Sequence, residues 1–142
     1  MMIAIESFRA RHGLLKPKIK AAFHAALDFL RKKQAYLEVF LVSDAEIRRL
    51  NRRFRGKNRP TNVLSFGPTS GFPSPKTRRA FLGEIFLAPD YALRKKESLA
   101  RLLVHGLLHL LGYTHASFHD KIRMEALENR IDEYLRRRKI YF

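Results

Sequence analysis

Apolar and polar residues alternate along most of the chain with the periods expected of helices and strands. Over residues 16–33 the apolar positions Ile19, Phe23, Leu27 and Leu30 recur every three or four residues, which predicts an amphipathic helix. Four shorter segments are rich in β-branched and aromatic residues and predict strands, at residues 3–6, 36–42, 62–66 and 81–87. The pattern therefore predicts a chain that mixes helices and strands.

Capping residues and helix breakers set the remaining boundaries. Ser43 followed by Glu46 has the form of a capping box and predicts a helix that runs to about Phe54. A second helix is expected from Pro89 to about Leu111, and a third over residues 118–137. Residues 55–60 form a basic turn with Gly and Pro, and residues 67–76, with three Pro and two Gly, predict an irregular surface loop.

Length and composition are those of one folded domain. The chain has 142 residues, and the hydrophobic share of 46% is enough to bury a core. Cysteine is absent, which excludes disulfides, thiolate catalysis and cysteine-based metal sites, so any metal ion must be held by His, Asp or Glu. We expect residues 1–142 to form a single domain.

The charge points to a polyanionic partner. Lys and Arg number 29 against 13 acidic residues, a formal net charge of +16, which RNA, DNA or an anionic membrane surface would complement. The start of the chain lacks the apolar core and cleavage site of a signal peptide. The strongest apolar stretch, from Leu102, contains two His and is shorter than the roughly 20 residues needed to cross a bilayer. We expect a cytoplasmic protein without a membrane partner.

Three histidines carry the most specific chemical signal. His105 and His109 are four residues apart in a predicted helix, so both side chains project from one face and can hold a single ion. Gly112 allows the chain to turn back, and His115 can then supply a third nitrogen. Three imidazoles leave a fourth position open for water, whose pKa a metal ion lowers towards ~7.

Alternatives to this metal site are weaker. A single His on an apolar face is usually a structural residue, but three within eleven residues, two of them on a segment expected to be buried, favour a shared ion. Zinc suits three imidazoles, although nickel, copper or iron would also bind. His119 falls at the start of the next helix and is at most a residue that supports a ligand. Gly106 stands where a zinc peptidase of the HExxH type has its glutamate base, which disfavours proteolysis.

A cationic segment precedes the histidines. Seven Arg or Lys lie within twelve residues, and a solvated basic surface is one interpretation. The other is a phosphate-binding track, in which Arg55 approaches a phosphate from the Gly-bearing turn. Phe54 and Phe66 could stack on bases, although both more often serve the core. The candidate RNA-binding residues are Arg48, Arg52, Arg53, Arg55, Lys57 and Arg59.

Two separated motifs resemble the YbeY family of bacterial endoribonucleases. Residues 105–115 read HGLLHLLGYTH and resemble the family signature HGxLHLxGYDH, with Thr114 in place of the usual Asp. Leu50-Asn51, the run from Arg55 to Phe66, and Leu82-Gly83-Glu84-Ile85 match further family segments, and residues 124–128 resemble the helix that follows the histidines. The resemblance covers roughly residues 36–130.

The resemblance implies both a fold and a function. It implies an α+β, zincin-like domain with a small mixed sheet and the metal-bearing helix packed across it. It makes His105, His109 and His115 ligands of one Zn²⁺ and gives Arg55 and His105 the catalytic roles. It further implies a single-strand-specific endoribonuclease of rRNA maturation, acting at the 3′ end of the small-subunit rRNA and in ribosome quality control. The implied partners are single-stranded rRNA, the small ribosomal subunit and its assembly factors.

Two functional hypotheses from different classes remain. The first is the endoribonuclease, in which the metal site promotes phosphodiester cleavage while Arg55 stabilises the added negative charge. The second is an RNA-binding ribosome assembly factor whose metal ion is structural. A fourth protein ligand would favour the structural role, and an open position would favour the catalytic one.

Overall fold

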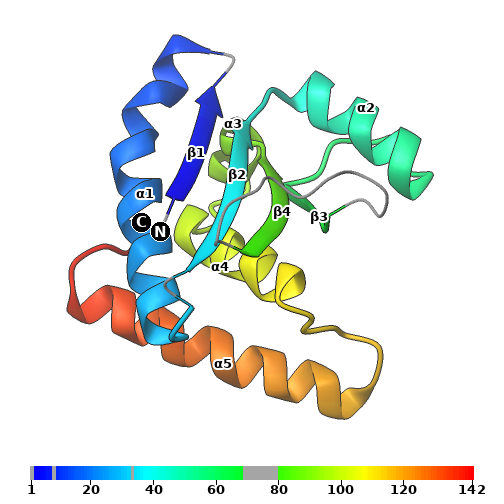
Figure 1. Ribbon diagram of the computed structural model, residues 1–142. Helices are drawn as coiled ribbons and strands as arrows, with labels where there is room; N and C mark the ends of the chain where they lie inside the picture. Colours follow the sequence, from blue (N-terminus) through cyan, green and yellow to red (C-terminus); the bar gives the residue numbers. More distant parts are fainter. Residues whose placement is uncertain (1, 8, 33, 69–79) are drawn as a thin grey trace.

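The computed structural model describes residues 2–7, 9–32, 34–68 and 80–142. Four strands and five α-helices with one 3₁₀ helix follow each other along these residues (Figure 1). In chain order they are β1 (Met2–Ser7), η1 (Ala10–Leu15), α1 (Lys16–Phe29), β2 (Ala35–Leu41), α2 (Asp44–Arg55), β3 (Val63–Phe66), β4 (Ala80–Leu87), α3 (Pro89–Arg94), α4 (Leu99–Leu110) and α5 (Phe118–Arg137).

The strands form one mixed sheet in the order β1-β2-β4-β3. β2 pairs in parallel with β1 and with β4, whereas β3 pairs antiparallel to β4 and forms one edge. Val39 in β2 lies between Ile5 and Ile85 of the two parallel neighbours. This arrangement confirms the predicted α+β class with a small mixed sheet.

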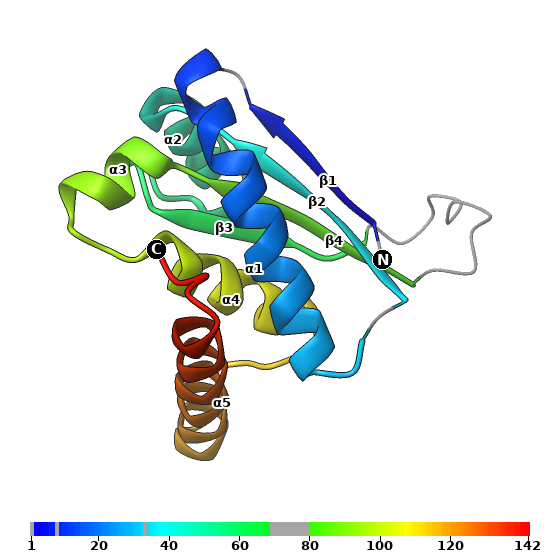
Figure 2. The ribbon, with the colours of Figure 1, turned by 90° about the vertical axis from the view of Figure 1, so that its left-hand side faces the viewer.

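The main hydrophobic core lies between the sheet and the helices α1 and α4. Side chains alternate along β2, and Leu37, Val39 and Leu41 are fully buried in this core. The helices α1 and α4 lie over the same face of the sheet (Figure 2). α4 contributes Leu103 and Leu107 to the same core, and α5 packs beneath α4. The helix that carries two of the histidines is therefore fixed against the sheet, as predicted.

A second, smaller cluster places α2 against the other side of the sheet. Ile47 and Leu50 of α2 pack with Leu64, Phe40 and Phe86. The predicted cap is present, since the Ser43 hydroxyl accepts a hydrogen bond from the Glu46 N–H at 3.2 Å, whereas the Glu46 carboxylate pairs with Arg49. The helix ends at Arg55 because Gly56 adopts a left-handed conformation with φ of 70°.

Gly83 brings the sheet edge close to α4. The pairing of β2 with β4 shifts by one residue at Leu82, and Gly83 has a φ of 132°. A Cβ atom at this position would lie 2.2 Å from the backbone oxygen of Phe66 and 3.0 Å from a side-chain carbon of Leu110. Only glycine allows β3 to approach both β4 and α4 so closely.

The prediction of a single helix from Pro89 to about Leu111 is wrong. Two helices replace it, α3 and α4, separated by a turn in which Lys96 has a φ of 57°. The break occurs because Ser98 caps a new helix, accepting a hydrogen bond from the Arg101 N–H at 3.2 Å. The Glu97 N–H closes the turn on the Ala92 carbonyl at 3.0 Å. The apolar spacing of residues 99–110 had concealed this local capping signal.

Other boundaries differ by a few residues. α1 ends at Phe29 rather than Lys33, because Arg31 adopts a φ of 56°, and Lys33 itself lies outside the described residues. The 3₁₀ helix η1 has no counterpart in the prediction. Most of the loop predicted over residues 67–76 also lies outside the described residues. None of the helices in the described part of the chain combines the length and apolar character required to cross a bilayer.

Candidate metal centre and its cleft

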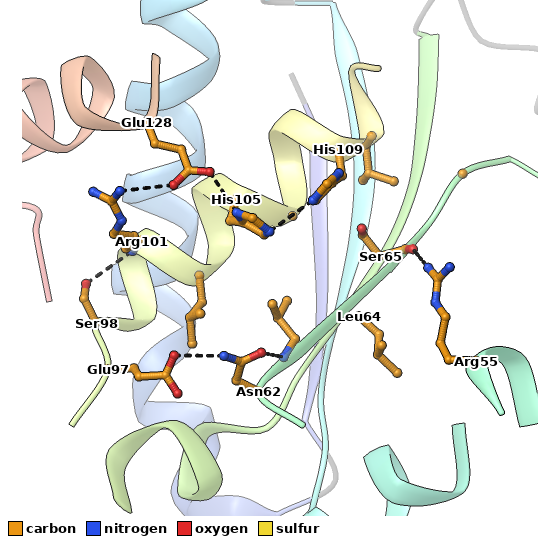
Figure 3. Close-up of a pocket in the computed structure, with 15 residues that line it drawn as sticks. Arg55, Asn62, Leu64, Ser65, Glu97, Ser98, Arg101, His105, His109 and Glu128 are labelled. Carbon is orange, nitrogen blue, oxygen red and sulfur yellow. Dashed lines mark hydrogen bonds and ion pairs between the residues drawn. The ribbon is translucent and has the colours of Figure 1, made fainter. Parts of the chain in front are cut away.

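α4 and the segment after it bring the three predicted histidines together. His105 and His109 project from successive turns of α4 (Figure 3). Gly112, with a φ of 101°, lets the chain turn back after the helix, so that His115 faces the other two. One nitrogen from each ring lies within 4.8 Å of the others. This spacing could hold a single metal ion.

Hydrogen bonds fix the orientation of the two helical imidazoles. His109 donates from Nδ1 to the Tyr113 carbonyl at 3.0 Å, and His105 donates from Nδ1 to the Glu128 carboxylate at 2.8 Å. Both Nε2 atoms then face each other at 3.0 Å. Burial and the neighbouring His105 lower the pKa of His109, which favours its neutral form.

A metal ion fits this arrangement of nitrogens. In neutral rings that donate from Nδ1, both Nε2 atoms carry lone pairs, and two facing lone pairs repel unless a cation lies between them. Ligand nitrogens at about 2.0–2.1 Å from a tetrahedral ion are roughly 3.3 Å apart, close to the observed 3.0 Å. The donor set therefore has the chemistry and the spacing of a histidine metal site.

Glu128 of α5 supports the site from behind. Its carboxylate is buried, with 4% of the residue exposed, and it accepts from His105 while pairing with Arg101 at 3.2 Å. Burial alone would raise the pKa of Glu128, but the hydrogen bond from His105 and the charge of Arg101 together lower it. Arg101 in turn pairs with Asp132 and donates to Asn129 at 3.0 Å. An ionised Glu128 holds the His105 ring in place.

His105 and His109 open onto a cleft of about 820 Å³ between α4 and the edge strand β3. Arg55 lies at one end, where its guanidinium donates to the Ser65 carbonyl at 3.2 Å and lies 5.5 Å from the centre of the Phe66 ring. Asn62, Glu97 and Arg101 line the other end (Figure 3). His105 and His109 lie between these ends. The cleft therefore joins the cationic turn to the histidine cluster.

The predicted RNA-binding residues divide into two groups. Arg55, Lys57 and Arg59 line a second hollow of about 320 Å³, which shares Arg55 and Leu64 with the main cleft. The buried Asn51 holds this turn by donating to the Arg59 carbonyl at 2.9 Å. The other three predicted residues, Arg48, Arg52 and Arg53, line neither hollow. Of these, Arg48 donates a hydrogen bond to the Asn58 side chain.

The two aromatic candidates have different surroundings. Phe66 contacts Phe86 with ring centres 5.8 Å apart and belongs to the cluster under α2. Phe54 packs edge-on against Phe66, yet 54% of the residue is exposed beside the Arg55 turn. Of the two, Phe54 has the exposed surface that stacking on a base requires.

His119 and Thr114 lie near the cluster without joining it. His119 is the second residue of α5, is exposed, and is not among the three clustered histidines. Thr114, which replaces the family Asp, donates from its hydroxyl to Asp120 at 3.3 Å. The same oxygen accepts from the Ala116 N–H at 3.4 Å. Thr114 thus stabilises the loop that carries His115.

Several cleft residues escaped the sequence analysis. Glu128 occupies the apolar face of α5 together with Met124, Ile131 and Leu135, and a charged residue on such a face indicates a buried partner. That signal could have suggested Glu128 without naming His105 as the partner. The contact between Asn62 and Glu97, which are 35 residues apart, has no equivalent signal.

Comparison with known proteins identifies the relatives of this chain. The family model described as "Endoribonuclease YbeY" matches residues 5–136. The chain is 35% identical to the Endoribonuclease YbeY of Persephonella marina, over 87% of this chain and 86% of the relative. It is 34% identical to that of Geobacter metallireducens, over 96% of this chain and 97% of the relative. The chain belongs to the endoribonuclease YbeY family.

A solved structure supports the same fold. The solution structure of TM1509 from Thermotoga maritima superposes with a TM-score of 0.54 and 26% identity, covering 98% of this chain and 95% of that one. Membership of the family confirms the resemblance of both motifs, because the matched residues include the basic turn and the histidine cluster. In the structure these two YbeY motifs lie on the same cleft.

Proposed function

We propose that this chain is a metal-dependent endoribonuclease that cleaves single-stranded RNA in the cleft between α4 and β3. His105, His109 and His115 hold one metal ion, for which zinc is the best match to three imidazoles. The observation that carries the proposal is the cluster of three ring nitrogens within 4.8 Å, of which His105 and His109 line a cleft that also contains Arg55. Family membership supplies the class of reaction.

The side chains of the cleft divide the work. A bound zinc ion would lower the pKa of a coordinated water and polarise a phosphoryl oxygen. His105 orients one ligand nitrogen through its hydrogen bond to Glu128. Arg55 contacts the scissile phosphate and offsets the negative charge that grows on its oxygens during cleavage. Gly106 stands where a peptidase of the HExxH type has its glutamate base, and a Cβ at this position would lie 3.3 Å from the Ile85 side chain.

The number of metal ligands favours catalysis over a purely structural metal. Within the described residues the group able to hold a metal ion consists of three histidines, and one of them, His115, is exposed. A tetrahedral ion held by three nitrogens keeps one position for water or substrate. A fourth protein ligand would have favoured the assembly-factor hypothesis, so the three-histidine group makes the nuclease the stronger proposal.

RNA approaches the cleft from the basic turn in this proposal. Arg55, Lys57 and Arg59 line the adjoining hollow, and Arg48, Arg52 and Arg53 add positive potential from α2. The net charge of +16 supports a polyanionic substrate. By family resemblance we assign the chain to cytoplasmic rRNA maturation at the 3′ end of the small-subunit rRNA and to ribosome quality control. Its partners would be the small ribosomal subunit and its assembly factors.

A direct test compares metal-loaded and chelator-treated protein on single-stranded and duplex rRNA fragments. We expect cleavage of the single strand by the metal-loaded protein only. His105→Ala, purified in parallel, should be inactive and guards against contaminating nucleases. Equal cleavage by the chelator-treated protein or by His105→Ala would refute the proposal, and equal cleavage of duplex would remove its single-strand part.

A further inference from the structure

Asn62 and Glu97 form a fixed polar pair at the end of the cleft opposite Arg55. Asn62 donates from its side-chain nitrogen to the Glu97 carboxylate at 2.8 Å (Figure 3). The Asn62 side-chain oxygen accepts from the Val63 N–H at 2.7 Å. Because a backbone N–H can only donate, this bond orients the amide and directs its NH₂ group towards Glu97. The carboxylate is thereby held from the backbone of β3.

Glu97 stands on the turn that divides α3 from α4. Its N–H bonds to the Ala92 carbonyl at 3.0 Å, and the next residue, Ser98, caps α4. The position of the carboxylate is therefore set by backbone contacts on one side and by Asn62 on the other. A carboxylate offers about four acceptor sites, of which Asn62 uses one. The remaining sites are available to a ligand in the cleft.

The charge at this end of the cleft is opposite to that of the whole protein. Two carboxylates line it, those of Glu97 and Glu128, against one cation, the guanidinium of Arg101, which already pairs with Glu128. A phosphate would be repelled here, whereas an N–H donor would be accepted. The chain as a whole, with a net charge of +16, attracts the phosphates of a nucleic acid. The acidic end of the cleft instead favours the N–H groups of a base over a phosphate.

We propose that Asn62 and Glu97 form a subsite for an unpaired nucleobase that carries an amino group, next to the scissile phosphate. The inference rests on the proposed function. Glutamate accepts from the N4 amino group of cytosine, and single-stranded RNA exposes this base edge. Uracil presents a carbonyl oxygen there instead. The apolar side chains of Val63 and Leu102 line the same region and give the base a surface to pack on.

The position of the pair agrees with one nucleotide of separation from the metal centre. Glu97 directly precedes Ser98, the N-cap of α4. Ser98 is seven residues before His105, which corresponds to about 10 Å of helix rise. A phosphate near His105 and Arg55 would leave the base of a neighbouring nucleotide free to reach Glu97. The backbone of the RNA is thus held at the cationic end, and one base is read at the acidic end.

The test uses single-stranded oligonucleotides that differ only by cytidine or uridine at each position next to the cut. We expect the wild-type protein to cleave the cytidine substrate about tenfold faster in kcat/KM at one of these positions. Glu97→Gln should reduce this ratio to about twofold or less, because the amide can present N–H instead of oxygen. Glu133→Gln, the matched control on exposed α5 surface, should keep the wild-type ratio.

Binding provides a second readout that does not depend on cleavage. Chelator-treated protein should prefer the cytidine oligonucleotide in fluorescence anisotropy, and Glu97→Gln should lose the preference. If the wild-type protein cuts no RNA, the proposed function fails, while the binding ratio still decides the subsite. Metal content and melting temperature of Glu97→Gln should match the wild type, and Glu97→Ala is the second variant if they do not.

Two outcomes would overturn the inference. One is the absence of any cytidine preference in wild-type binding and cleavage. The other is an equal preference in wild type and Glu97→Gln. If Glu97→Gln keeps the base preference but loses sensitivity to a 2′-deoxy substitution at that nucleotide, Glu97 contacts a ribose hydroxyl instead of a base.

Discussion

The two ends of the cleft differ in charge and in how their side chains are held. At one end Arg55 projects from the last turn of α2 and, among the described residues, donates one hydrogen bond, to the Ser65 carbonyl. At the other, Glu97 and Glu128 accept bonds from Asn62, His105 and Arg101. The cationic end is exposed and adjustable, whereas the acidic end is preorganised. A substrate that is anionic along its backbone and neutral at its bases matches this division.

Loss of the proposed metal ion should have the largest effect, because the histidines that would hold it include His105 and His109, which lie between the two ends. His109→Ala should reduce cleavage to the level of chelator-treated protein. It should also remove the stabilisation by zinc, which for a bound ion at a hundred times its Kd is about 2.7 kcal/mol. Cleavage assays and melting curves with and without zinc measure both effects. His119→Ala, outside the cluster, is the control and should behave as wild type.

Arg55→Ala should have the second-largest effect, and it should change only the cationic end of the cleft. A guanidinium that acts on the developing charge contributes about 10²–10³-fold in rate, so single-turnover cleavage should slow by this factor. RNA affinity should change much less and metal content should be unchanged. Arg55→Lys should recover part of the rate, because it keeps the charge without the two-point contact.

The control for Arg55 is Arg49, which pairs with Glu46 on the exposed face of α2. Arg49→Ala should cause a small loss of affinity that disappears as salt screens the field. Equal mild effects of the two alanine substitutions would show that Arg55 only adds positive potential and would remove it from the site.

Glu128→Gln tests the preorganised end at the metal. Glutamine can still accept from His105, but it lacks the charge that keeps the imidazole strongly bound and oriented. We expect zinc affinity to fall by roughly 10–100-fold, measured by competition with a chelator of known affinity. Glu133→Gln changes the same charge on exposed surface and should leave the affinity as it is. Identical affinities of the two variants would contradict a role for Glu128.

The salt dependence of RNA binding should reveal the smallest difference. Affinity should fall linearly with salt on logarithmic axes, as release of counterions requires. Arg55→Ala should lower the slope by about one, the effect expected for one lost phosphate contact. Glu97→Gln should leave the slope unchanged, because that end contacts no phosphate. A loss of slope in Glu97→Gln, or an unaltered slope in Arg55→Ala, would reverse the assignment of the two ends.

The sequence was most informative where the signal is local. The periodicity of β2, the Ser43 cap and the spacing of His105 and His109 each depend on residues within a few positions, and the structure contains all three. The sequence analysis did not predict the break between α3 and α4. The apolar spacing of residues 99–110 suggested a helix that continued back to Pro89, although Ser98 is a typical helix N-cap residue. Periodicity describes a face and not the continuity of a helix.

The other cleft residues that the sequence did not predict are held by contacts between residues far apart in the chain. Glu128 meets His105 across 23 residues and Asn62 meets Glu97 across 35, so neither pair follows from spacing along the chain. The acidic end of the cleft therefore became visible only in three dimensions. The cationic end could be anticipated, because its charges are adjacent in the sequence.

Gly83 does not line the cleft, yet a substitution at this position should disturb the arrangement of the residues that do. Any side chain there would collide with the Phe66 backbone and push β3 away from Leu110. The displacement would carry Ser65, and with it the anchor of Arg55, out of line with the histidines. A selection for inactive alleles should therefore recover missense changes at codon 83 whose products still bind zinc and still fold around the main core.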